Sequence, residues 1–534
     1  MNTIKSSYFL LFSFFFVGEI FAQQNHLNII PEPLAIELKA GDFIIKKGCT
    51  ISLQKDFSEA MPSVLFLQTL IKKESGIFPV INPVATAARQ SKGNIHILKD
   101  EKITNEEEYY LTIDKSGIQI KASSQKGVFY AFQTLSQLIA SSNTKSANIA
   151  LPAVSIHDKP RFPFRALMLD PARHFLNVAD LKKYIDAMAL YKYNALHLHL
   201  SDDQGWRVEI KSLPKLAEIS AIRKEMDGDG KPHQGYYTQE QLKDIVKYAQ
   251  ERNIEIIPEI DVPGHNVAAL AAYPELSCEQ QSMQVSTIAG VSKELLCAGN
   301  EKVYEFYEKV IAELAEVFPS KKFHIGGDEA PLDKWKKCPR CQSQIQKQQL
   351  KDEHQLMGYF FKRIGTILEK YQKEPLIWYE LDVPEYPQNS TMYLWRYGTA
   401  KKVIETTRKE GYKLIASPGE HAYFDYPQQE NDLPNVDWMP LLTLKQVYDF
   451  DPTYGLPTEQ SKHIIGVEAC LWGESVKTID RAFYMTFPRA LAFSEAGWSE
   501  MKNRNWDDFK NKIPFHLNWL LNKAINYRPP VELY

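Results

Sequence analysis

The chain has 534 residues, more than a single hydrophobic core usually supports, so we expect two or three domains. Hydrophobic residues make up 44% of it and charged residues 24%, as in ordinary soluble globular proteins. The 63 Lys and Arg residues against 66 Asp and Glu residues give a net charge of −3. This balance gives no basis for binding nucleic acid and fits a neutral or mildly polar partner better.

The first residues have the pattern of an export signal. Lys5 is followed by an almost wholly apolar stretch from Tyr8 to Val17, and Ala22 fits the last position before a cleavage site. The stretch is shorter than the roughly 20 residues that span a bilayer, so a signal peptide over residues 1–22 is favoured over a membrane anchor. We expect a bacterial chain that is exported to the periplasm or the outside, with no membrane segment once the signal is removed.

Six cysteines in an exported chain suggest disulfides. Cys278 and Cys297 flank one loop and are candidates to pair. Cys338 and Cys341, in the sequence C-P-R-C, are candidates for a small local disulfide. The C-P-R-C segment also fits half of a zinc site, but a zinc ribbon needs a second Cys pair, and none follows it. The remaining cysteines lie in apolar, strand-like segments and are expected to be free and buried: Cys49 and Cys470.

Residues 25–157 are expected to form a small, non-catalytic α+β domain with an antiparallel sheet. Two segments of helical period, Ser58–Glu74 and Gly127–Ile139, interleave with short apolar runs of strand character. The prolines Pro160 and Pro163 mark the hinge to the next domain. The strand-like runs are Phe43–Ile45, Asn94–Leu98, Tyr109–Ile113 and Gly117–Ile120.

From Arg165 onward, short apolar runs alternate with amphipathic stretches of helical period, which indicates parallel strands joined by helices. There are eight runs, the number that closes a (β/α)8 TIM barrel, and we place this α/β barrel at residues 160–505, with a C-terminal helix and tail at 506–534 packing on it. A doubly wound open sheet is the alternative, but no glycine-rich phosphate loop opens any of its helices. The runs are Ala166–Leu169, Ala195–Leu200, Ile254–Ile260, Lys322–Ile325, Leu376–Tyr379, Met392–Trp395, Lys413–Ala416 and Ile464–Leu471.

Nearly every run ends in charged or aromatic polar residues. Asp202 follows the second run, His265 the third and Glu474 the last. Because the C-terminal ends of barrel strands all face one mouth, where barrel enzymes keep their chemistry, these side chains should gather there. A buried unpaired charge costs several kcal/mol, so the crowding indicates pairing or function.

The segment His324–Ala330, with the sequence H-I-G-G-D-E-A, carries the most specific pattern. Its two glycines release the backbone from regular pleating, so that both Asp328 and Glu329 can reach the mouth. Two adjacent carboxylates repel, which tends to raise one pKa and lower the other, a division of labour suited to glycoside chemistry. Taken alone, the dipeptide is explained equally well by a metal site or by Asp328 capping a helix.

This segment resembles the signature of glycoside hydrolase family 20, the β-N-acetylhexosaminidases. Three more segments are similar to that family in order and spacing: Leu169–Phe175, His197–Arg207 and Pro258–His265. The resemblance extends over nearly the whole mature chain. It implies an exo-acting, retaining enzyme that releases terminal β-linked GlcNAc or GalNAc from an oligosaccharide or glycoconjugate, with no cofactor and no metal.

In this family the 2-acetamido oxygen of the substrate attacks its own anomeric carbon and forms an oxazolinium-type intermediate. The resemblance assigns proton transfer to Glu329, and to Asp328 the acetamido N–H and the developing positive charge. Tyr423 would donate to the acetamido oxygen. Asp202 and His265 resemble the pair that orients and tunes the acid/base.

The remaining candidate positions bind the sugar. Arg173 and Glu474 resemble the residues that hold O3 and O4, and Asp425 would bind O4 or O6. A closed pocket with Arg173 and Glu474 at its floor admits only a terminal sugar, which predicts exo action. Three tryptophans resemble the aromatic walls around the acetamido methyl and the apolar sugar face: Trp378, Trp395 and Trp472.

Two other functions compete with this interpretation. His197, His199 and Asp202 include the H-x-H pattern of metal-dependent barrel hydrolases. A carbohydrate-binding relative that has lost catalysis is the third class. The joint presence of Asp328, Glu329 and Tyr423 argues against it, because binding alone does not need an acid.

Overall fold

The computed structural model describes residues 27–84, 93–142, 148–432 and 439–533. The expected signal peptide, residues 1–22, lies outside the described residues. Among the helices of the described residues, none combines the length and apolar character that crossing a membrane requires.

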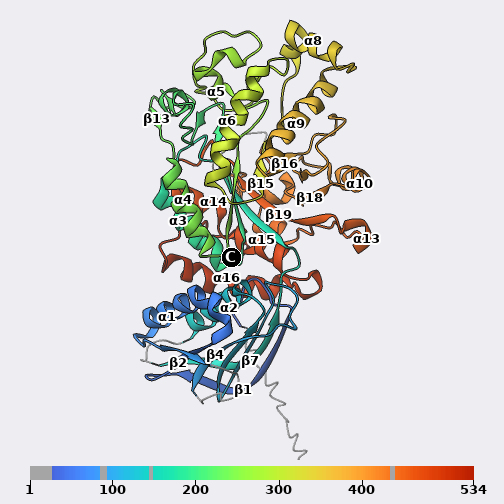
Figure 1. The fold of residues 1–534 in the computed structure, drawn as a ribbon. Helices are drawn as coiled ribbons and strands as arrows, with labels where there is room; N and C mark the ends of the chain where they lie inside the picture. The colour runs from blue at the N-terminus through green and yellow to red at the C-terminus, as the bar shows by residue number, and fades with distance from the viewer. Residues whose placement is uncertain (1–26, 85–92, 143–147, 433–438, 534) are drawn as a thin grey trace, which may run out of the picture.

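The N-terminal domain is a seven-stranded sheet with two helices, α1 (Met61–Ser75) and α2 (Gln125–Ser141), packed on it. Side chains on β5 (Tyr109–Asp114) alternate between buried and outward positions, because successive strand residues point to opposite faces. In Figure 1, α2 lies between this sheet and the barrel. The antiparallel strands are β1 (Ala35–Ile45), β7 (Ile149–Asp158), β5 and β6 (Gly117–Ala122), and the sheet continues in parallel through β4 (Asn94–Lys99), β2 (Thr50–Gln54) and β3 (Val80–Val84).

The second domain is a closed barrel of eight parallel strands, in the order β14-β15-β16-β17-β18-β19-β8-β9. Each of the eight apolar runs forms one strand, so the (β/α)8 prediction is confirmed and the open sheet is excluded. The strands are β8 (Phe164–Leu169), β9 (Ala195–His199), β14 (Glu255–Glu259), β15 (Lys322–His324), β16 (Glu374–Trp378), β17 (Thr391–Leu394), β18 (Lys413–Ala416) and β19 (Ile464–Leu471).

Amphipathic helices surround the barrel (Figure 1). Their starts carry the expected capping residues: Thr238 forms a capping box with Gln241 at α4, and Asn300 caps α6. The longer helices are α3 (Val178–Leu190), α4 (Gln239–Gln250), α6 (Glu301–Val317), α8 (Pro339–Lys347), α9 (Glu353–Lys370), α10 (Ala400–Glu410), α14 (Ile479–Thr486), α15 (Arg489–Trp498) and α16 (Trp506–Leu521). The short ones are α5 (Val267–Ala272), α7 (Asp333–Lys337), α11 (Gly419–Ala422), α12 (Leu444–Tyr448) and α13 (Thr458–Ser461).

The N-terminal domain is fixed to the end of the barrel where the strands begin. Arg165, at the start of β8, forms two hydrogen bonds to Glu107, of 2.9 and 3.0 Å. Lys192 and Asp158 form a fully buried ion pair at 2.8 Å, and Trp498 donates to the same carboxylate at 2.8 Å. Because a buried charge needs such partners, the joint is specific, and it leaves the opposite mouth of the barrel open.

The described cysteines are all free thiols, so the two expected disulfides, Cys278–Cys297 and Cys338–Cys341, are wrong. The chain folds so that these four side chains meet in one cluster rather than in two separate pairs. Their closest sulfur atoms are 3.6–3.9 Å apart, far beyond a covalent bond of about 2.05 Å. The other two cysteines are free and buried as predicted: Cys49 and Cys470.

Candidate active site

A pocket of about 240 Å³ opens at the C-terminal ends of the barrel strands. All but one of the eleven candidate site residues line it; the exception, Trp378, lies beneath it. The lining residues are Arg173, His199, Asp202, Asp261, His265, Asp328, Glu329, Trp395, Tyr423, Asp425, Tyr426, Trp472 and Glu474.

The loop after β15 needs its two glycines. Gly326 and Gly327 have φ values of 62° and 99°, and a Cβ on Gly326 would lie 1.8 Å from a carboxylate oxygen of Asp261. That oxygen accepts the backbone N–H of Gly327 at 3.1 Å. Glu329 itself has a φ of 51°, a conformation that costs energy in a residue with a Cβ. The chain thus accepts backbone strain in order to turn Asp328 and Glu329 into the pocket.

A chain of charges runs along the floor of the pocket. Arg173 pairs with Asp202 at 2.8 Å, and Asp202 accepts from Nδ1 of His265 at 3.3 Å. On the other side of the ring, Nε2 of His265 lies 3.9 Å from Asp328 and 3.8 Å from Glu329. His265 also has a positive φ, of 51°. The imidazole therefore links Asp202 to both predicted catalytic acids.

The protonation states of Asp202 and His265 are set by the charges around them, which outweigh the effect of burial. Burial alone would raise the pKa of Asp202, but Arg173 and His265 outweigh it and hold that pKa well below its usual range. Burial would lower the pKa of His265, but Asp202 and Asp328 raise it well above its usual value. The imidazole is therefore a cation that faces the two acids.

Asp328 differs from Asp202 because no cation contacts it closely. Burial raises its pKa to about 7, with a further contribution from Glu329, against the opposing charge of His265. One carboxylate oxygen of Asp328 has no hydrogen-bond partner among the described residues. A buried acceptor without a partner costs about 1–3 kcal/mol, so this oxygen is suited to a donor on a ligand.

Tyr423 and Asp425 follow β18 and the short helix α11. Burial raises the pKa of the Tyr423 phenol well above its usual value, so the group stays protonated and can donate a hydrogen bond. Asp425 is buried, and one of its carboxylate oxygens has no partner in the described chain; the same holds for the indole N–H of Trp395. These groups add a donor and an acceptor to the pocket wall.

Aromatic rings close one side of the pocket. The Trp472 ring centroid lies 5.9 Å from that of Trp378 and 6.4 Å from that of Tyr423. The guanidinium of Arg173 lies over Trp472, at 5.1 Å from the ring centroid. Trp378 is 1% exposed, and its indole N–H donates to Glu259 at 2.9 Å. Trp378 therefore supports the wall from below instead of forming its surface.

Three supporting residues were not predicted. His199 bridges Asp202, at 2.8 Å, and Glu259. Glu380 accepts the backbone N–H of Glu329 at 3.2 Å and is held by Arg396 through two hydrogen bonds of 2.6 and 2.8 Å. The signal for Glu380 was its place two residues beyond the end of β16, and no pattern pointed to Arg396.

The metal interpretation of His197, His199 and Asp202 does not match the arrangement of these side chains. His197 groups with Glu259 and lies below the pocket, where its ring contacts Glu468 at 2.8 Å. His199 groups with Asp202 instead. In the described chain the three residues therefore belong to different clusters and do not form one ligand set.

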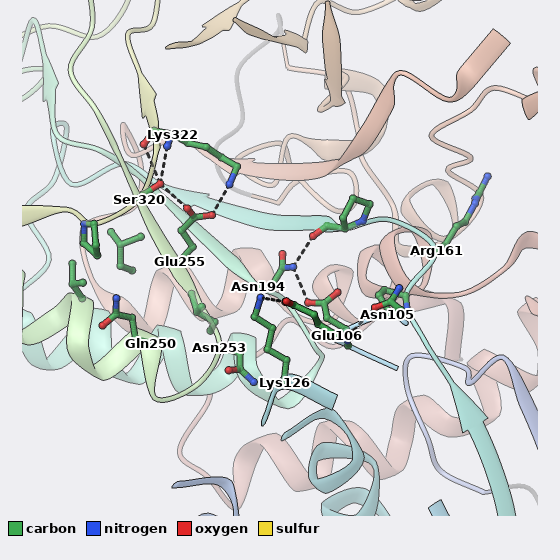
Figure 2. A pocket seen from close by; sticks show the side chains of 17 residues that line it. Asn105, Glu106, Lys126, Arg161, Asn194, Gln250, Asn253, Glu255, Ser320 and Lys322 are labelled. Carbon is green, nitrogen blue, oxygen red and sulfur yellow. Dashed lines mark hydrogen bonds and ion pairs between the residues drawn. The ribbon is translucent and has the colours of Figure 1, made fainter. Parts of the chain in front are cut away.

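A larger cavity, of about 840 Å³, lies at the other end of the barrel, against the N-terminal domain. Figure 2 shows its polar side chains bonded to one another: Glu255 to Lys322 at 2.8 Å and Glu106 to Lys126 at 2.7 Å. The start of barrel strands is where residues serve stability rather than catalysis. The smaller pocket is therefore the candidate active site.

Comparisons with known proteins agree with this geometry. The sequence profile "Glycosyl hydrolase family 20, catalytic domain" matches residues 162–501, and "Glycosyl hydrolase family 20, domain 2" matches residues 26–159. A β-hexosaminidase of Akkermansia muciniphila is 42% identical over 449 residues, which cover 83% of this chain and 90% of the relative. A β-hexosaminidase of Porphyromonas gingivalis is 37% identical over 513 residues, which cover 95% of this chain and 65% of the relative.

Among solved structures, the N-acetyl-β-hexosaminidase of Streptomyces plicatus in complex with Thio-NAglucal superposes with a TM-score of 0.83 at 31% identity. The match covers 95% of this chain and 97% of that one. Both domains and their order are thus shared with the relatives. This chain is a glycoside hydrolase and belongs to glycoside hydrolase family 20.

Proposed function

We propose that the chain is an exo-acting, retaining β-N-acetylhexosaminidase that removes terminal, non-reducing β-linked GlcNAc or GalNAc by substrate-assisted catalysis. One observation carries the proposal. Asp328, Glu329 and the protonated phenol of Tyr423 line a single small pocket, where the charge chain from Arg173 to His265 also ends. This set supplies one proton donor and two groups that orient an acetamide.

Glu329 is the proposed acid and base. Its side chain is 35% exposed at the pocket rim, where both a leaving group and a water molecule can reach it. The cation of His265 beside it and the Glu380 contact to its backbone hold it in place. It would protonate the departing glycosidic oxygen and then remove a proton from the attacking water.

Asp328 and Tyr423 are proposed to hold the nucleophile that belongs to the substrate. The free oxygen of Asp328 would accept the acetamido N–H, and the phenol of Tyr423 would donate to the acetamido oxygen. Positive charge then develops near Asp328, which favours its ionised form. Holding an intramolecular nucleophile in reach is worth roughly 7–11 kcal/mol of barrier.

The closed end of the pocket accounts for exo action. Arg173 is buried and fixed by Asp170 and Asp202, at 2.9 and 2.8 Å, and its nitrogen lies 3.8 Å from Glu474. Together with Asp425, these groups are proposed to bind the outer hydroxyls of one terminal sugar. Trp472 and Trp395 are proposed to cover its apolar face and acetamido methyl, with Trp378 beneath.

The test is a panel of aryl β-glycosides and natural oligosaccharides with the purified chain. We expect hydrolysis of aryl β-N-acetylglucosaminide or galactosaminide, no hydrolysis of the matched glucoside, and stepwise release of single terminal sugars. A thiazoline analogue of the oxazoline should inhibit competitively. Cleavage within chitin fragments, or failure of the thiazoline to bind, would contradict the proposal.

We also propose export to the periplasm or beyond, supported by the charged and apolar pattern of residues 5–17. Fractionation of cells that produce the whole chain, followed by N-terminal sequencing, tests it. Recovery of the mature chain outside the cytoplasm, starting after Ala22, is expected. An uncleaved chain in the cytoplasm would refute export.

A further inference from the structure

Four cysteines from separate segments meet beside the barrel mouth. Cys278 and Cys297 come from the loop between α5 and α6, and Cys338 and Cys341 from the junction of α7 and α8. The sulfur of Cys297 lies 3.7 Å from that of Cys338 and 3.6 Å from that of Cys341, and Cys278 lies 3.9 Å from Cys341. All four sulfur atoms lie within 4.8 Å of one another.

We propose that these four cysteines bind one Zn²⁺ in a structural site. In a tetrahedron with Zn–S bonds of about 2.3 Å, neighbouring sulfurs are about 3.8 Å apart, and the three closest pairs lie at 3.6–3.9 Å. Four sulfur ligands are typical of zinc or iron–sulfur centres rather than of Mg²⁺ or Ca²⁺. A complete set of four protein ligands leaves no position for substrate, as in structural zinc sites.

The backbone around the cluster is built for close approach. A Cβ on Gly299 would lie 2.3 Å from the carbonyl carbon of Arg340 and 2.6 Å from the backbone nitrogen of Cys341, so only glycine fits between the two segments. Ser277 and Leu296 form an isolated antiparallel β-bridge, which brings together the two strands of the loop that carry Cys278 and Cys297. The ligand positions are therefore fixed by packing and backbone hydrogen bonds.

Charge around the cluster also fits bound thiolates. A zinc ion with four thiolates carries a net charge of about −2. The guanidinium of Arg340 lies at the cluster and donates to the carbonyls of Ser277 and Cys278, both at 2.9 Å. This arginine is placed as an outer partner that offsets the ligand charge.

The site would brace the two loops that carry the predicted acid and its histidine. Leu296, next to Cys297, donates its N–H to the carbonyl of Pro263, two residues before His265. Trp335, on the segment between Glu329 and Cys338, donates to the carbonyl of Leu296 at 2.9 Å. Zinc would thus tie the loop after β14 to the loop after β15, outside the pocket.

Metal analysis of the purified chain, prepared without chelators or a metal-affinity tag, tests the proposal. We expect about one zinc per chain, with its four thiols protected from alkylation until the metal is removed. The double variant C278S/C341S should lose at least most of that zinc. The matched control is Cys49→Ala, which removes a buried cysteine of the other domain and should leave the zinc content unchanged.

A second measurement does not depend on the variants folding. X-ray absorption at the zinc edge of the unaltered chain should show four sulfur neighbours at about 2.3 Å. Removal of zinc should lower the Tm, and zinc, but not Mg²⁺, should restore it. A metal-free chain with two disulfides, a metal-free chain with four reactive thiols that takes up no zinc, or a chain that binds iron instead would each overturn the proposal.

Discussion

The two ends of the barrel handle charge in opposite ways. At the end that faces the N-terminal domain, each carboxylate that lines the large cavity has a basic partner at 2.7–2.9 Å: Glu106, Glu107 and Glu255. In the smaller pocket at the other end, Asp202 has such a partner, but the nearest basic atoms lie 3.8–3.9 Å from three carboxylates: Asp328, Glu329 and Glu474. Asp425 has no ion-pair partner in the described chain.

The difference shows that cavity volume is a poor guide to function in this molecule. The cavity of about 840 Å³ is a seam between domains, where each carboxylate has a basic partner and the pair of Glu107 with Arg165 joins the two domains. The pocket of about 240 Å³ keeps buried acceptors and donors without partners, at a cost of about 1–3 kcal/mol each. Such groups are kept because a ligand satisfies them.

Replacing Glu329 with Gln should have the largest effect, because it removes the only group proposed to move protons. We expect kcat/KM on an aryl N-acetylglucosaminide to fall by about 10²–10⁴-fold, with an unchanged circular dichroism spectrum. The matched control is Glu255→Gln at the opposite end of the barrel, which should leave activity unchanged. Full activity of the Glu329 variant, or an equal loss in the control, would contradict the proposed difference between the two ends of the barrel.

Replacing Asp328 with Asn should reduce kcat by about 10²–10³-fold, since it removes a charge aimed at the transition state. The same change should raise the Tm near neutral pH. Because the folded pKa is about 7, well above the unfolded value of about 3.9, the folded chain holds a proton that the unfolded chain has released. Stability therefore falls as the pH rises from about 4 to 7, and the Asn variant lacks this loss.

The same pKa gives a pH profile for the unaltered chain. Asp328 is protonated in the free enzyme below about pH 7, so kcat/KM should decrease as the pH falls through this value. Thermal unfolding and kinetics over pH 4–8, for the chain and for the Asp328 variant, measure both effects. A variant that is active, or less stable than the unaltered chain at pH 7.5, would contradict the assigned role.

Replacing Tyr423 with Phe removes one hydrogen-bond donor and nothing else from the pocket wall. We expect kcat to fall by about 10²-fold, with a smaller change in KM. Rate measurements with a substrate whose acetamido oxygen is replaced by sulfur separate this role from packing, because the phenol then has a weaker acceptor and its loss should matter less. An equal loss on both substrates would assign Tyr423 to packing alone.

The sequence alone predicts the barrel and most of the residues that line the pocket, for a physical reason. Apolar runs mark strands, and their polar ends share one mouth, so Asp202, His265 and Glu329 are placed without knowledge of contacts. The position of Trp378 at the end of β16 was also readable. Its place beneath the pocket was not, because that depends on its hydrogen bond to Glu259 across the barrel.

The four-cysteine cluster could not be predicted from sequence patterns. Spacing along the chain identifies C-P-R-C but gives no second pair after it, and it makes Cys278 and Cys297 candidates to pair because they flank one loop. The cluster forms because Gly299 lets two segments pack closely. This packing belongs to the tertiary structure, so the spacing of the cysteines along the sequence does not predict it. Arg396 is similar: nothing before folding shows that it meets Glu380.

The smallest effect is expected for an ion pair whose two charged side chains are both partly exposed. Glu255 and Lys322 are 34% and 31% exposed, and such pairs contribute about 0.2–1 kcal/mol. Glu255→Gln should therefore lower the free energy of unfolding by no more than about 1 kcal/mol and leave kcat/KM unchanged. Urea unfolding of this variant and of the double variant with Lys322→Met gives the coupling energy of the pair. If either change impaired catalysis without unfolding the chain, the large cavity in Figure 2 would have a role in function. The proposed difference between the two ends of the barrel would then be wrong.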